Sequence, residues 1–158
     1  MKRIAFLVLC IIFARNCHAE ITYLTTIDGV RLTSESIVRN VSLGNFDAAW
    51  GAFKLVASVP EAEYKAAYAQ TFGKLPEQTL RWGASQGYEW VSEEYIGTRI
   101  VRCTLMIIYD DMPIRWVLNF YRKRNGWSLM FMNYDGNVPS WPIPGANPSS
   151  VRTAPSGP

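Results

Sequence analysis

The chain has 158 residues, 49% of them hydrophobic, which is enough for one domain with its own core. Its formal charge of +3 comes from Lys2, Arg3 and Arg15, so the remainder from residue 20 onward is neutral. The overall charge therefore gives no reason to expect a nucleic-acid partner, because such binding depends on a basic surface that neutralises phosphates.

Residues 1–19 have the pattern of a secretory signal peptide. Lys2 and Arg3 precede eleven apolar residues, and small residues follow at Cys17 and Ala19. This order predicts cleavage after Ala19 and a periplasmic or secreted protein. Eleven apolar residues are too few to span a bilayer core, which takes about twenty. We therefore expect no stable membrane anchor, and the charged Arg15 argues against a lipoprotein signal.

Removal of residues 1–19 would leave Cys103 as the only cysteine and no histidine, because His18 is the only one in the chain. An intramolecular disulfide is then excluded. Catalysis by Ser-His-Asp or Cys-His groups and a zinc site of His and Cys are excluded as well. We expect no metal, no cofactor and no assigned catalytic residue. Cys103 lies within an apolar segment and should pack as a small hydrophobic side chain.

The first half of the domain shows helical periodicity. Residues 20–32 are expected to form an extended N-terminal arm, followed by a single α+β domain over residues 33–137. A hydroxyl of Thr33 or Ser34 would cap the first helix of this domain. Apolar residues then recur at helical spacing. The expected helices span residues 36–43, 45–56, 60–72 and 77–84.

From Gly87 the apolar period changes to two, which predicts strands. The expected strands span residues 88–95, 98–109, 114–122 and 127–134. Asn125-Gly126 marks a hairpin. On the last strand, Trp127, Leu129, Phe131 and Asn133 should share one face. The fold class is therefore α+β, with N-terminal helices packed on a strongly curved, cone-like antiparallel sheet of about four strands.

Three further segments carry expectations about surfaces and order. One face of the third strand, with Arg115, Val117, Asn119 and Tyr121, is less polar than a solvated sheet face should be. Either a partner subunit covers this outer face or its aromatic side chains are partly exposed, and we favour a homodimer. Arg122-Lys123-Arg124 is interpreted as a solvated loop that keeps the hairpin soluble. Residues 138–158 contain six prolines and little apolar content, so we expect a disordered tail.

Candidate functional residues come from polar and aromatic side chains expected between the helices and the sheet. A buried Glu93 or Glu94 with a raised pKa could act as a base beside Tyr64 or Tyr68. A small apolar cavity with a few polar groups is the usual form of a ligand site. Its candidate lining residues are Trp50, Tyr64, Tyr68, Arg102, Trp116, Asn119 and Asn133.

Several short motifs resemble those of a known superfamily. They are Gly44–Trp50, Arg81 with Gly83, Arg115-Trp116, Phe120-Tyr121 and Gly126–Leu129. With these motifs the chain resembles the nuclear transport factor two-like (cystatin-like, cone-shaped) superfamily, and within it small exported bacterial proteins of unknown function. The resemblance implies helices and a curved sheet around a conical cavity, often in dimers. It covers isomerases, dehydratases and non-catalytic binding modules, and the enzymes commonly use an Asp or His inside the cavity.

Three functions are compatible with these observations. The first is an exported, non-catalytic module that binds a small apolar molecule or a protein partner in the cavity between helices and sheet. The second is an isomerase- or hydrolase-like enzyme of the same fold that uses a buried Glu and a Tyr. The third is a purely structural, dimeric interaction protein. Fold analogy alone does not choose among them.

Overall fold

The structure is a computed structural model, and it describes residues 22–137. The expected signal peptide and the expected C-terminal tail lie outside the described residues. Within residues 22–137, no helix is both long enough and apolar enough to cross a membrane.

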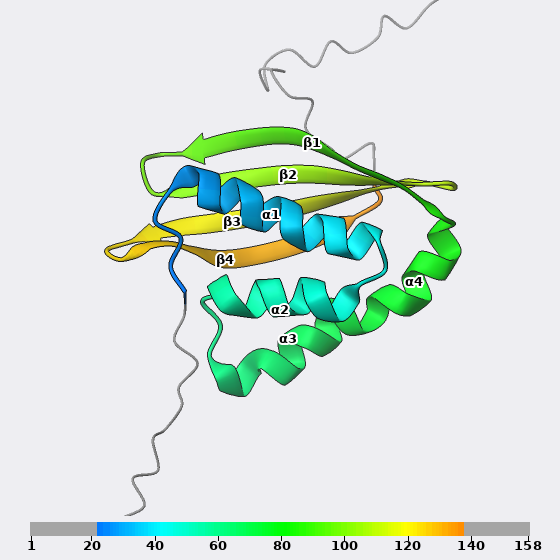
Figure 1. Ribbon diagram of the computed structural model, residues 1–158, viewed down its shortest axis with the longest axis horizontal. Coiled ribbons are helices and arrows are strands. Elements are labelled where there is room, and N and C mark those ends of the chain that lie inside the picture. Colours follow the sequence, from blue (N-terminus) through cyan, green and yellow to red (C-terminus); the bar gives the residue numbers. More distant parts are fainter. Residues whose placement is uncertain (1–21, 138–158) are drawn as a thin grey trace, which may run out of the picture.

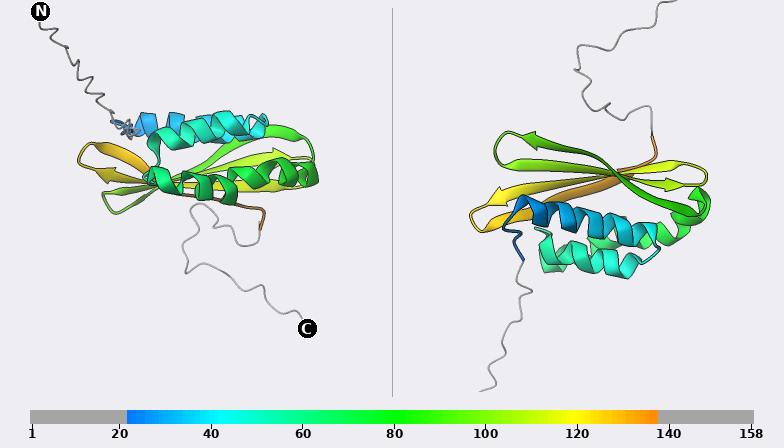
Figure 2. Two further views of the ribbon diagram at one scale, coloured as in Figure 1. Left: turned by 90° about the horizontal axis from the view of Figure 1, so that it is seen from below. Right: turned by 45° about the horizontal axis from the view of Figure 1, so that its top comes forward.

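Four α-helices precede a four-stranded antiparallel sheet, which confirms the α+β class (Figure 1). α1 and α2 lie on one face of the twisted sheet, and α3 and α4 continue beyond α2 (Figure 2). The helices are α1 (Ile27–Ser42), α2 (Phe46–Val56), α3 (Tyr64–Gln70) and α4 (Leu75–Trp82), with 3-10 turns at Glu61–Glu63 and Phe72–Lys74. The strands are β1 (Ser85–Ile96), β2 (Ile100–Tyr109), β3 (Pro113–Lys123) and β4 (Gly126–Asp135).

The core lies between α1, α2 and one face of the sheet, here called the helix face. The strands pair in the order β1-β2-β3-β4, so consecutive strands are neighbours joined by hairpins. Alternate residues of β2 and β3 are buried on the helix face, as the period of two predicts. These residues are Val101, Cys103, Leu105 and Ile107 on β2 and Ile114, Trp116, Leu118 and Phe120 on β3. The opposite side of the sheet is called the far face.

The first helix begins earlier than the sequence pattern predicted. α1 starts at Ile27, and the Thr26 hydroxyl accepts a hydrogen bond from the Gly29 N–H at 3.1 Å, which caps the helix. Ser34 is buried inside the helix, and its hydroxyl donates to the Val30 carbonyl oxygen at 2.8 Å. The expected extended arm over residues 20–32 is thus wrong from Ile27 onward, because a better cap lies upstream.

Two later helix predictions also needed correction. The helix expected over residues 60–72 is shorter, because the α-helix spans only Tyr64–Gln70 and both Glu61–Glu63 and Phe72–Lys74 form 3-10 turns. The helix expected over residues 77–84 spans 75–82 and includes Pro76 in its first turn, where a missing N–H costs nothing. It ends at Gly83, whose φ of 84° suits glycine.

A β-bulge reverses the faces along β4. Asn119 pairs with Phe131, but the next residue, Phe120, pairs with Leu129, so Met130 has no opposite residue. Trp127 and Leu129 are buried on the helix face, whereas Phe131 is 51% exposed on the far face. The prediction that Phe131 and Asn133 share a face with Trp127 and Leu129 is therefore wrong, because the extra residue shifts the alternation by one.

The outer edge of β4 is covered by two other segments. The backbones of Leu24 and Trp127 exchange two hydrogen bonds of 3.0 and 2.8 Å. Ala57 forms a parallel bridge with Leu129, and the Ser58 N–H donates to the Leu129 oxygen at 2.8 Å. Gly126 permits the first contact, because its φ is 130° and a Cβ there would lie 2.5 Å from the Leu24 oxygen.

Candidate functional site

The seven residues predicted to line one cavity lie in three different places. Trp50, Tyr64 and Tyr68 come together between α2 and α3. Trp116 is fully buried in the core on the helix face. The remaining three residues, Arg102, Asn119 and Asn133, lie on the far face of the sheet.

The first group forms an aromatic cluster around Trp50. The spacing of Phe46, Trp50 and Phe53 along α2 directs these rings to one side of the helix. The Trp50 ring stacks on Phe53 with centroids 5.0 Å apart, and it meets the edges of Tyr64 and Tyr68 at 5.8 and 5.4 Å. These distances fall in the range favoured by aromatic pairs. Phe72, which is fully buried, lies 5.5 Å from Trp50 and supports the cluster from below.

A shallow hollow of about 360 Å³ opens over this cluster and is lined by Trp50, Lys54, Tyr64, Lys65 and Tyr68. The Lys54 ammonium lies 5.8 Å from the centre of the Trp50 ring, within cation–π range. The Tyr64 hydroxyl donates to the Lys54 carbonyl oxygen at 3.4 Å. The hollow thus offers flat aromatic surface beside two ammonium groups. It lies between helices, where α2 separates it from α1 (Figure 1), and not between the helices and the sheet.

Aromatic rings fill the space between α4 and the sheet, part of the region between helices and sheet where a cavity was expected. Trp116 stacks on Tyr134 with centroids 4.8 Å apart, and the Tyr134 hydroxyl donates to the Gln78 Oε1 at 2.6 Å. Trp82 packs against Tyr109 at 5.2 Å, and burial raises the pKa of Tyr109 to about 12. Within residues 22–137, the Tyr109 hydroxyl and the Trp116 Nε1 have no hydrogen-bond partner.

The polar residues of the far face satisfy one another. The Arg102 Nε donates to the Asn119 Oδ1 at 3.2 Å, and the Arg102 Nη1 lies 3.7 Å from the Glu94 Oε2. Cross-strand pairing places these three side chains in a row over β1, β2 and β3. Asn133 is exposed on β4. The row explains how an arginine and an asparagine are accommodated on strands that are otherwise largely apolar.

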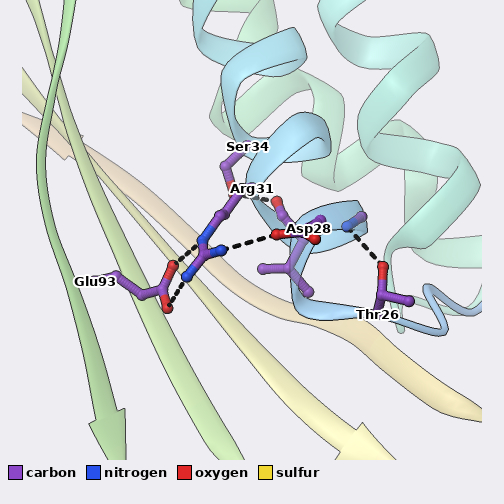
Figure 3. A network of polar contacts seen from close by, with 7 residues as sticks. Thr26, Asp28, Arg31, Ser34 and Glu93 are labelled. Carbon is purple, nitrogen blue, oxygen red and sulfur yellow. Dashed lines mark hydrogen bonds and ion pairs between the residues drawn. The ribbon is translucent and has the colours of Figure 1, made fainter.

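Glu93 is the inward carboxylate, and it is held by α1 (Figure 3). The Arg31 Nε and Nη2 donate to its two oxygens at 2.6 and 3.0 Å, and the Arg31 Nη1 donates to Asp28 at 2.8 Å. These hydrogen bonds from Arg31 lower the pKa of Glu93, although partial burial opposes them. The predicted general base needs a raised pKa, and the pKa of Glu93 is lowered, so Glu93 does not fit the enzyme hypothesis.

Cys103 lies near this ion pair but is not an activated thiol. Its side chain is fully buried on β2, and burial raises the pKa of the thiol to about 11. The thiol is therefore protonated at neutral pH, and the thiolate is the nucleophilic form. Among the described residues, no group of three His, Cys, Asp or Glu side chains is placed to hold a metal ion.

The Arg31–Glu93 pair predicts how stability changes in acid. Because the pKa of folded Glu93 is below the ordinary value of about 4.3, the unfolded chain binds more protons in this range. The free energy of unfolding should fall as pH drops below about 4.3, towards the folded pKa, and this contribution should be constant above that pH. Urea unfolding at several pH values from about 3 to 6 measures the slope.

Glu93→Gln should flatten this slope, because the titrating group is gone. Glu94→Gln, at the next residue on the far face, leaves the Arg31–Glu93 pair intact and should keep the wild-type slope. Equal slopes for wild type and Glu93→Gln would show that the ion pair makes no contribution to acid sensitivity.

Comparison with known proteins places few constraints on this site. No family model matches the chain, and no curated protein matches it. Among solved structures, the chain is similar to a protein from Campylobacter jejuni, provisionally named an NTF2-like transpeptidase, with 9% identity and a TM-score of 0.47. The match covers 65% of this chain and 97% of that one. The name of that protein contains the superfamily that the sequence resembles. A similarity this low carries no argument about activity.

Proposed function

We propose that this protein is a non-catalytic binding module whose α2–α3 hollow takes a small, flat, largely apolar molecule with a negative charge. The observation that carries the proposal is the position of Trp50, a partly exposed ring between two lysines and two tyrosines. Ligand sites typically combine such apolar surface with a few polar groups that orient the ligand. Lys54 and Lys65 would supply the attraction for an anionic group.

Two features of the molecule favour binding over catalysis. The inward carboxylate of Glu93 is occupied by Arg31, and the Cys103 thiol is buried with a raised pKa. The residues that line the hollow are aromatic rings and lysines, which include no carboxylate and no thiol.

The composition of residues 1–19 adds the proposal that the module acts in the periplasm or outside the cell.

The test uses the fluorescent probe anilinonaphthalene sulfonate, which is flat, apolar and anionic. We expect Trp50→Leu to weaken its binding about tenfold, because leucine keeps a core contact but removes the flat ring. Lys54→Gln combined with Lys65→Gln should weaken binding about fivefold by removing the cations. Lys74→Gln, an exposed lysine outside the hollow, is the matched control and should leave the affinity unchanged.

Unchanged affinity in Trp50→Leu would refute this site. Circular dichroism of each variant separates a lost site from a lost fold. Native mass spectrometry of the protein isolated from its own cells then measures whether a natural ligand is bound. An added mass that disappears on denaturation and is absent from Trp50→Leu would identify the ligand class.

The far face supports a second candidate, a homodimer. The bulge on β4 leaves Met130 and Phe131 about half exposed, at 50% and 51%, on the same sheet as the half-buried Val117 and Tyr121. A second copy would cover this apolar surface. Val117→Lys should then convert a dimer to a folded monomer in sedimentation equilibrium, and a monomeric wild type at tens of micromolar would rule this candidate out.

A further inference from the structure

Two hairpins bring four basic residues together at one end of the sheet, here called the basic tip. Arg99 lies in the turn between β1 and β2, and Arg122, Lys123 and Arg124 lie at the turn between β3 and β4. Both turns lie at the same end of the sheet, on the left in Figure 1. The Arg122 N–H donates to the Arg99 carbonyl oxygen at 2.8 Å, and the four side chains with Thr98 line a hollow of about 310 Å³.

Carboxylates are separated from the basic tip. Within residues 22–137, none of its four cations forms an ion pair, and no acidic residue lines the hollow. The nearest acidic residues along the chain, Glu93 and Glu94, are paired with Arg31 and Arg102. By contrast, the turn between β2 and β3 at the opposite end of the sheet contains Asp110 and Asp111. The sheet is thus basic at one end and acidic at the other.

The basic tip also exposes apolar side chains. Tyr95 and Ile96, at the end of β1, are 56% and 45% exposed beside the Gly97–Arg99 turn. Tyrosine together with arginine and lysine is the composition that settles at the boundary between lipid and water. An exposed isoleucine at such a position favours a lipid surface over a nucleic acid, which offers charged phosphates and flat bases rather than an aliphatic layer.

We propose that the basic tip docks reversibly on a bilayer surface rich in anionic lipid. Arg99 and Arg124 contact lipid phosphates, Arg122 and Lys123 add positive charge beside them, and Ile96 enters the headgroup layer. The acidic turn at Asp110 and Asp111 points away from the membrane, so the charge separation orients the protein upright on the surface. This is peripheral binding by surface side chains, and it requires no membrane-spanning segment.

Arg99 and Arg124 suit a test better than Arg122 and Lys123, which both contact other residues of the fold. Arg122 lies over the Trp127 ring at 5.8 Å, and the Lys123 Nζ donates to the Ser58 hydroxyl at 2.9 Å. Arg99 and Arg124 are exposed, and residues 22–137 provide no side-chain partner for either of them. Their replacement should change surface charge without changing the fold.

The experiment measures partition of the full chain onto vesicles by sedimentation. One set contains equal parts of phosphatidylglycerol and phosphatidylcholine, and the other contains phosphatidylcholine alone. We expect partition more than about 25-fold stronger on the anionic set, because two of the four basic residues already account for that factor. Arg99→Gln with Arg124→Gln should reduce it about 25-fold, since each basic residue near such a surface contributes about fivefold. Ile96→Ser should reduce partition severalfold with an unchanged salt dependence.

The matched control removes the same charge elsewhere, with Arg39→Gln and Lys74→Gln, two exposed positions outside the basic tip. It should stay within about twofold of wild type. All variants share the same N-terminal residues, so any contribution from residues 1–19 cancels. An equal loss in the control would overturn the proposal, because net charge alone would then explain binding. Equal binding to neutral vesicles would overturn it as well.

A single-stranded RNA oligomer provides the competing outcome. If it binds more tightly than the anionic vesicles and loses affinity in Arg99→Gln with Arg124→Gln, then the basic tip is a nucleic-acid surface and the lipid proposal is wrong. Trp50→Leu should partition like wild type, so failure of the α2–α3 hollow and failure of the basic tip are distinguishable.

Discussion

Replacement of Trp116 by alanine should lower the free energy of unfolding by about 3–5 kcal/mol. The indole has no exposed surface, stacks on Tyr134 at 4.8 Å and lies opposite Leu105 in the middle of the sheet. Domains are stable by only about 5–15 kcal/mol, so this loss would remove a large share of the total stability. Urea unfolding followed by circular dichroism measures it.

Trp116→Phe is the informative partner variant. Phenylalanine keeps a ring against Tyr134 but removes the Nε1–H, which has no partner in residues 22–137. An unpaired buried donor costs about 1–3 kcal/mol, so its removal should offset part of the lost volume. We expect less than half of the destabilisation seen with alanine. Equal destabilisation by both substitutions would mean that the indole N–H makes a stabilising hydrogen bond.

Phe72→Ala should produce the second large effect, again about 3–5 kcal/mol. Phe72 is fully buried, and its ring lies 5.5 Å from Trp50, 5.9 Å from Phe53 and 6.5 Å from Tyr68. Its loss would remove the support beneath the hollow between α2 and α3. The same variant should therefore lose both stability and binding of anilinonaphthalene sulfonate, measured by urea unfolding and by fluorescence titration.

Phe72→Leu serves as the control for volume. A leucine fills most of the space, so its cost should stay below about 1.5 kcal/mol. Binding should then persist if the hollow depends on the position of Trp50 and not on the Phe72 ring itself. A loss of binding with full stability in this variant would assign Phe72 a direct part in the ligand site.

Much of the fold could be predicted because the local signals are strong. The alternation from Ile114 to Phe120 matches the buried face of β3, and Asn125-Gly126 marks the hairpin that the structure contains. Helix starts were harder, because Thr26, Thr33 and Ser34 are all competent capping residues. The sequence pattern does not show which hydroxyl lies at the chain entry into the helix. The bulge at Met130 was also missed, because period-two alternation continues through Phe131 until pairing with β3 is known.

The candidate site was predicted only in part, for a related reason. Trp50, Tyr64 and Tyr68 lie on neighbouring helices, so their shared apolar sides brought them together. Arg102 and Asn119 lie on the far face. The sequence pattern shows which residues of a strand share a face, but it does not show which of the two faces the helices cover. The meeting of Arg99 with Arg122 depends on the alignment of two hairpins. Single-sequence patterns do not contain such long-range pairing.

The covering of β4 by Leu24 and Ala57 limits how this sheet could grow. An unpaired strand offers a row of N–H and C=O groups to another chain. Leu24 and Ala57 occupy part of that row on β4, which leaves β1 as the open margin of the sheet within residues 22–137. Strand addition between copies is thus favoured at β1 and hindered at the Trp127–Leu129 part of β4, and a propagating fibre needs two open edges on each subunit. The short segment before α1 and the residues after α2 therefore reduce the length of strand edge that β4 offers to another copy of the chain.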